Sequence, residues 1–132
     1  MENKVYYTKT IEKSLKYAFN DLSKALKKFG FGVLVSIDVK KTLKEKIGVL
    51  DFYPYLILGV CNPKLAYSAL TKNKYVGLLL PCNIVLLEKI PGKTTIALLD
   101  PLSALGLLND KNLKNVGSLA KERLLEALNS LE

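Results

Sequence analysis

The sequence predicts an α+β fold: a curved, largely antiparallel sheet of 4–5 strands with two long helices packed on one face. Three observations predict it. Helical and β-rich segments alternate along most of the 132 residues. A short turn joins the last two β-rich segments, which makes at least one strand pair antiparallel. Near the start and at the end of the chain, apolar residues recur at the spacing of an amphipathic helix.

The first quarter of the chain is predicted to form a strand, a helix and a second strand. Residues 5–10, VYYTKT, alternate and are rich in β-forming residues. Thr10 is expected to cap a helix that stops at Gly30. Residues 31–37, FGVLVSI, are expected to form the second strand. The apolar face of the helix consists of Ile11, Leu15, Ala18, Phe19, Leu22, Ala25, Leu26 and Phe29.

A short charged helix and a central strand are expected next. Asp38 is the predicted cap of the helix over residues 38–48. Residues 55–61, YLILGVC, are almost uninterrupted in their apolar character, which is typical of a strand buried on both faces.

A third helix is predicted over residues 62–73, with Asn62 at the cap and Pro63 at the first helical position. The apolar segment 74–81 contains a glycine and a proline, so it is interpreted as part strand and part turn.

The last third of the chain is predicted to contain a hairpin and two helical segments. Residues 83–90 and 94–100 flank the turn sequence PGK. A helical turn begins at Asp100-Pro101, and an amphipathic helix runs over residues 111–131. No linker or long repeat interrupts the chain, so residues 1–132 are interpreted as a single domain.

The charge balance permits a polyanion partner but argues against nucleic acid. The formal net charge is +8, from 20 lysines and arginines against 12 acidic residues. A lysine-driven polyanion or nucleic-acid binder is therefore one hypothesis. However, Arg123 is the only arginine, the lysines are scattered, and base recognition favours arginine.

Several function classes are excluded by what the composition lacks. There is no histidine, so Ser-His-Asp, Cys-His and His-rich zinc chemistry are excluded. No apolar run reaches the roughly 18 residues of a membrane span, and the amino terminus lacks the apolar middle of a signal peptide. We expect a cytoplasmic protein with free thiols. Abundant Lys and Leu, with no Gln or Trp, fit a thermophile.

The two cysteines each precede an asparagine and lie next to a proline. Cys61 is expected just outside the amino terminus of the third helix, where free N–H groups, the helix dipole and Lys64 would lower the thiol pKa. If the two chain corners meet, two thiols and two amides border one pocket. The candidate ligand or reactive-thiol residues are Cys61, Asn62, Pro63, Lys64, Pro81, Cys82 and Asn83.

Several interpretations of these corners remain open. They can form a pocket for a small anionic or thiol-reactive ligand, a redox or persulfide site, or a metal-thiolate site. They can also be purely structural, because free cysteine behaves as a small hydrophobe and Asn and Pro commonly form caps and turns. The cofactor is unknown, and no metal site is predicted. Asp51, Tyr53 and Tyr55 are weaker candidates for the same corner.

Four segments together resemble the "domain of unknown function 302" family: FGVLVSIDVKKTLKEKIGV, PYLILGVCNPKLAYSAL, GLLLPCNIVLLE and ALLDP. The resemblance covers roughly residues 5 to 130. It implies a compact α+β domain classed with TATA-binding-protein-like folds, often homodimeric, with no established reaction. Likeness of fold to a DNA-binding protein does not transfer its function.

We therefore expect a small cytoplasmic binding or interaction module that forms a homodimer, without membrane association. Its ligand pocket is expected near Cys61 and Cys82. A thiol-dependent redox, persulfide or metal-thiolate protein is the alternative, and the polyanion binder is the second alternative.

Overall fold

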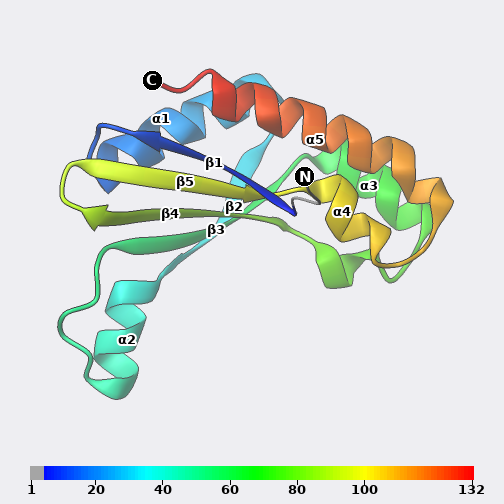
Figure 1. Cartoon of the computed structure of the whole chain (residues 1–132). Coiled ribbons are helices and arrows are strands. Elements are labelled where there is room, and N and C mark those ends of the chain that lie inside the picture. Colours follow the sequence, from blue (N-terminus) through cyan, green and yellow to red (C-terminus); the bar gives the residue numbers. More distant parts are fainter. Residues whose placement is uncertain (1–4) are drawn as a thin grey trace.

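A five-stranded antiparallel sheet of strand order β1-β5-β4-β3-β2 organises the computed structural model, which describes residues 5–132 (Figure 1). The strands are β1 (Tyr6–Ile11), β2 (Gly32–Asp38), β3 (Tyr55–Cys61), β4 (Cys82–Ile90) and β5 (Lys93–Leu99). The helices are α1 (Leu15–Lys28), α2 (Val39–Ile47), α3 (Pro63–Lys72), α4 (Pro101–Gly106) and α5 (Lys114–Asn129), with 3-10 turns η1 (Val76–Leu79) and η2 (Lys111–Leu113). The predicted α+β class with an antiparallel sheet is confirmed.

One face of the sheet carries helices α1, α3, α4 and α5, whereas α2 extends to the other side near β2 and β3 (Figure 1). The core lies under these four helices because every second residue of the inner strands points toward them. On β5, for example, Ile96 and Leu98 are buried between more exposed neighbours. Burial of each such side chain stabilises the fold by about 1.5–3 kcal/mol.

The opposite face of the sheet is not covered by these helices and carries few charged side chains: alternation along β5 places Lys93 on the same face as Thr95. Paired residues of neighbouring antiparallel strands share a face, so the register assigns this face directly. It consists of Tyr6, Thr8, Thr10, Val35, Ile37, Tyr55, Ile57, Gly59, Cys61, Asn83, Val85, Leu87, Lys93, Thr95 and Ala97. This set is named the uncovered face below.

The start of the first helix differs from the sequence prediction. Thr10 and Ile11 belong to β1, where they pair with β5, and α1 begins at Leu15. The Leu15 N–H donates to Glu88 Oε1 at 2.9 Å, and the Gly92 N–H donates to the other oxygen at 2.8 Å. These bonds from Gly92 and Leu15 lower the pKa of Glu88. The Glu88 carboxylate, 73 residues away in the sequence, therefore accepts the first N–H of α1, a role predicted for Thr10.

Two other predictions are corrected. Residues 74–81 contain no strand: the chain forms η1 there and then a cis peptide bond between Leu80 and Pro81. The last helix is shorter than predicted, because residues 111–113 form the 3-10 turn η2 and α5 begins at Lys114.

Three predicted caps are confirmed. Asp38 accepts a hydrogen bond from the Lys41 N–H, Asn62 from the Leu65 N–H, and Asp100 from the Leu102 N–H. Each cap satisfies an N–H that the helix leaves without a partner. Within residues 5–132, none of the helices combines the length and the apolar character that crossing a bilayer requires.

Candidate functional site

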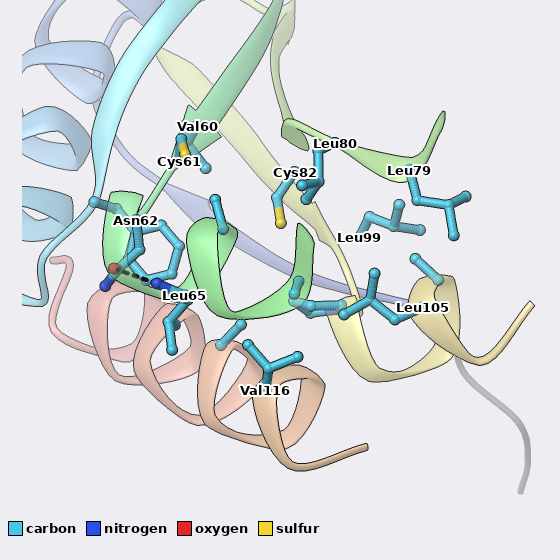
Figure 2. A pocket seen from close by; sticks show the side chains of 16 residues that line it. Val60, Cys61, Asn62, Leu65, Leu79, Leu80, Cys82, Leu99, Leu105 and Val116 are labelled. Atoms are coloured by element: carbon cyan, nitrogen blue, oxygen red, sulfur yellow. Dashed lines mark hydrogen bonds between the residues drawn. The ribbon is translucent and has the colours of Figure 1, made fainter. Parts of the chain in front are cut away.

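A small, almost entirely apolar pocket lies where the end of β3 and the start of β4 meet α3, α4 and α5. Cys61, Asn62 and Cys82 contribute to its wall (Figure 2). The remaining lining residues are Phe31, Val60, Leu65, Ala66, Ala69, Leu79, Leu80, Leu99, Pro101, Ala104, Leu105, Val116 and Ala120. The sequence corners around the two cysteines therefore meet in space.

The position of Cys82 follows from the packing of the proline before it. The Pro81 ring lies against Gly59 on the neighbouring strand: a Cβ added to Gly59 would be 2.6 Å from Pro81 Cγ and 2.7 Å from Val35 Cγ1. Only glycine at position 59 leaves room for this ring, so Pro81 packs on the sheet. Cys82 follows Pro81 and is the first residue of β4. Cys82 then pairs with Val60 of β3.

The two sulfur atoms do not face each other. Paired residues share a face, so Cys82 points to the helix-covered side together with Val60. Cys61 follows Val60 and is directed to the opposite side. In Figure 2 the Cys82 sulfur points into the pocket between α3 and the Leu99 and Leu105 side chains, and the Cys61 sulfur lies apart from it. A direct thiol pair is therefore not formed.

Burial raises both thiol pKa values, opposite to the lowering expected from the helix dipole and Lys64. For Cys61 the cause is desolvation. For Cys82, burial first and repulsion from a Cys61 thiolate second raise the pKa to about 11. The prediction of an activated thiolate at Cys61 is wrong, because desolvation disfavours the charged form here. Both thiols are free.

Asn62 lies between the pocket and a more polar groove, which runs between the amino-terminal end of α3 and helix α5. Its Oδ1 accepts the Leu65 N–H at 3.1 Å, and its side chain is part of both walls. Pro63 and Lys64 line the groove and not the pocket. The remaining candidates lie away from both cavities: Pro81 packs on Gly59, and Asn83 is exposed on the uncovered face. The seven candidates therefore divide among three places.

The pocket has a volume of about 40 Å³. That space accepts about three water-sized spheres, and it is well below the ~150 Å³ of an apolar cavity known to bind benzene. Among the lining residues, only Asn62, Cys61 and Cys82 carry a polar side-chain atom, and the Cys61 side chain is directed to the other side of the sheet. In residues 5–132, no three Cys, Asp or Glu side chains gather as metal ligands. The arrangement is suited to holding a small apolar group against the Cys82 sulfur.

Sequence reasoning missed most of the pocket wall. Leu65, Leu105 and Val116 come from three different helices, and in the sequence they have the pattern of ordinary core residues. Arg123 and Lys28, which line the groove, had no distinguishing signal either, because exposed cations are common on helices. Only the residues at the β3–α3 corner and at the start of β4 had a recognisable pattern.

The fold and pocket define a small α+β protein with an apolar site at one end of its sheet. The family model "Domain of unknown function DUF302" matches residues 7–131, and the chain belongs to this family. It is similar to the crystal structure of the uncharacterized conserved protein DUF302 from Bacillus stearothermophilus, with 35% identity, a TM-score of 0.87, and 96% of this chain and 98% of that chain covered. No curated protein matches the chain. The family is uncharacterised, and its likeness to TATA-binding-protein folds stays a prediction.

Proposed function

We propose that this protein is a small cytoplasmic binding module, and that its pocket takes a small apolar ligand or the apolar end of a larger one. One observation carries the proposal: the Cys82 sulfur points into a pocket whose other walls are almost entirely apolar (Figure 2). Ligand sites are commonly concave, apolar and provided with a few polar groups that orient the ligand. Here the Cys82 thiol is such a group.

The experiment is a methyl-NMR titration with propane, a small apolar probe without a polar group. Saturable shifts confined to the methyl groups of Leu65, Leu105 and Val116 support the proposal. The Ala104→Leu variant adds methyl groups to the pocket wall and is expected to abolish these shifts. Ala97→Leu makes the same change on the uncovered face and is expected to leave them unaltered. Unchanged shifts in wild type would refute the proposal.

The thiol-dependent alternative is less favoured. A redox couple or persulfide site needs a reachable thiolate. Both thiol pKa values are raised, and strand alternation directs the two side chains to opposite faces. A metal-thiolate site would need both sulfur atoms as ligands of one metal ion. The two side chains point to opposite faces of the sheet, which disfavours such a site as well.

We also propose that the protein binds a second copy of itself through the uncovered face. The face spans all five strands and carries Lys93 at one end of β5, whereas the chain as a whole carries a net charge of +8. Two such copies repel each other over most of their surfaces. On this sparsely charged face that repulsion is weakest, and Tyr6, Val35 and Ile37 are exposed there.

A further inference from the structure

We infer that the outer side of α3 and η1 is a docking surface for an anionic lipid bilayer. The surface is separate from the proposed apolar pocket. Residues on the inner side of these elements, such as Ala69 and Leu79, line the pocket, whereas those on the outer side are exposed and are not part of its wall. The exposed set consists of Tyr67, Leu70, Lys72, Lys74, Tyr75 and Leu78, and is named the α3–η1 surface below.

Four large apolar side chains of this surface are exposed. The exposed fractions are 72% for Tyr67, 45% for Leu70, 60% for Tyr75 and 81% for Leu78. Tyr67 and Leu70 are three residues apart on α3 and therefore share a face of that helix. Tyr75 and Leu78 have the same spacing at η1, where side chains three residues apart lie above one another. Exposed apolar groups gathered in this way mark binding surfaces.

The two pairs belong to one corner of the molecule. Residues 73–75 alone separate α3 from η1, and the two elements pack against each other. Figure 1 shows both at the end of the sheet opposite to the turn between β4 and β5. Lys74 places its Nζ 5.4 Å from the centroid of the Tyr75 ring. Charged and apolar side chains are therefore interleaved on this surface.

The charges of this corner are mainly positive. Residues 52–87 contain no Asp or Glu. A carboxylate from another element, Asp110, approaches the end of α3, where it is half-buried and accepts a hydrogen bond from Asn73 Nδ2 at 3.1 Å. Lys111 follows it, so the two lysines of the surface, Lys111 and Asp110 have a formal sum of +2. Anionic lipid headgroups attract lysines that lie near a membrane surface.

The composition favours a lipid surface over a protein partner. Protein interfaces are enriched in arginine and depleted in lysine, whereas the α3–η1 surface contains lysines and no arginine. A second copy of the chain would bring the same positive charges to this surface and be repelled. Tyrosine rings and leucine side chains between lysines are typical of segments that lie at the boundary of headgroups and acyl chains.

This inference replaces the expectation of no membrane association. That expectation rested on the length of the apolar runs, and binding to the surface of a bilayer needs no spanning segment. The proposed cytoplasmic location is compatible with it, because the cytoplasmic leaflet carries anionic lipids.

The test uses tryptophan fluorescence, because the chain contains no tryptophan of its own. Leu78→Trp places a reporter on the α3–η1 surface, and Leu50→Trp places one at a similarly exposed position between α2 and β3. Vesicles of equal parts phosphatidylcholine and phosphatidylglycerol are expected to shift the emission of Leu78→Trp to shorter wavelength and to leave that of Leu50→Trp unchanged. Vesicles of phosphatidylcholine alone are expected to shift neither.

Co-sedimentation with the same anionic vesicles measures the contribution of the lysines. Lys72→Gln and Lys74→Gln are each expected to weaken binding about fivefold. Lys44→Gln and Lys46→Gln make the same change on α2 and are expected to bind like wild type.

An unshifted emission of Leu78→Trp with anionic vesicles, or equal shifts at both positions, would overturn the inference. A shift that needs no vesicles and follows the protein concentration would assign the surface to a second copy. A shift caused by polyglutamate but not by vesicles would assign it to an acidic protein, and both results would also overturn the lipid proposal. Propane reports on methyl groups of the inner side, so failure here leaves the apolar pocket untouched.

Discussion

Val60 and Cys82 occupy paired positions on β3 and β4, so their side chains point together toward the helices. This pairing decides the character of the site. It brings the Cys82 sulfur into the apolar pocket and directs Cys61, one residue after Val60, to the other side of the sheet. The two thiols therefore lie in different surroundings, although they are close in the fold.

The first prediction concerns the pH dependence of thiol alkylation. Burial raises the pKa of Cys82 to about 11. Because the thiolate is the reacting form, the rate for Cys82 in the native protein is expected to rise about tenfold per pH unit from pH 8 and to level off only near pH 11. Iodoacetamide labelling with mass spectrometry of the Cys82 peptide measures it, with the unfolded protein as control. A plateau at or below pH 9 would contradict the raised pKa.

Gly59→Ala is expected to destabilise the protein by roughly 1–3 kcal/mol, because the new methyl group overlaps Pro81 and Val35. Gly32→Ala is the matched control: nothing lies within 4 Å of its Cβ position on β2. That change is expected to be neutral or slightly stabilising. Urea unfolding of both variants measures the difference. Equal stability of the two variants would show that Pro81 does not need the space above Gly59.

The Asp100 carboxylate is expected to be a major stabilising group of the α4 corner. It is 3% exposed, caps α4 through the Leu102 N–H, accepts from Ser103 Oγ and pairs with Lys121 at 3.3 Å. Asp100→Ala is expected to lower the free energy of unfolding by about 2 kcal/mol, the upper end for a cap.

Asp110→Ala removes a cap of the same type from the short turn η2 and serves as the control. Its expected loss is about 1 kcal/mol or less, because Asp110 is only half-buried. Thermal unfolding of the two variants compares them. A larger loss for Asp110→Ala would mean that the Asp100 network adds little.

Self-association through the uncovered face predicts a dimer that a single central charge disrupts. Val85→Glu places a carboxylate in the middle strand of that face. It is expected to yield a monomer in sedimentation equilibrium at concentrations where wild type is dimeric, because the interface would bury an unpaired charge. Tyr17→Glu makes the same change of net charge on α1 and is expected to leave the dimer intact. A monomeric wild type would refute the proposed interface.

The fold was largely accessible from the sequence because its main signals are local. Asn62-Pro63 and Asp100-Pro101 begin helices as their cap chemistry predicts. The start of α1 was not accessible, because Glu88 caps it from a distant strand. The apolar segment 74–81 was misread because packing of η1 against α3 and α4, rather than strand propensity, decides its conformation.

The site was accessible only in part. The pattern around Cys61 and Cys82 indicated where two corners meet, and the structure brings both residues to one pocket. The direction of each side chain depends on strand register, which the sequence does not encode locally. The direction of the pKa shift of each thiol depends on its burial in the folded protein. Both properties arise from tertiary packing.

The most direct test of the apolar pocket is a crystal structure of the protein pressurised with xenon, an atom that enters small, dry, apolar cavities. The account predicts xenon density in van der Waals contact with Cys82 Sγ, between α3, α4 and α5, and a loss of that density in Ala104→Leu. Ordered water in that space, or xenon bound only elsewhere, would contradict it.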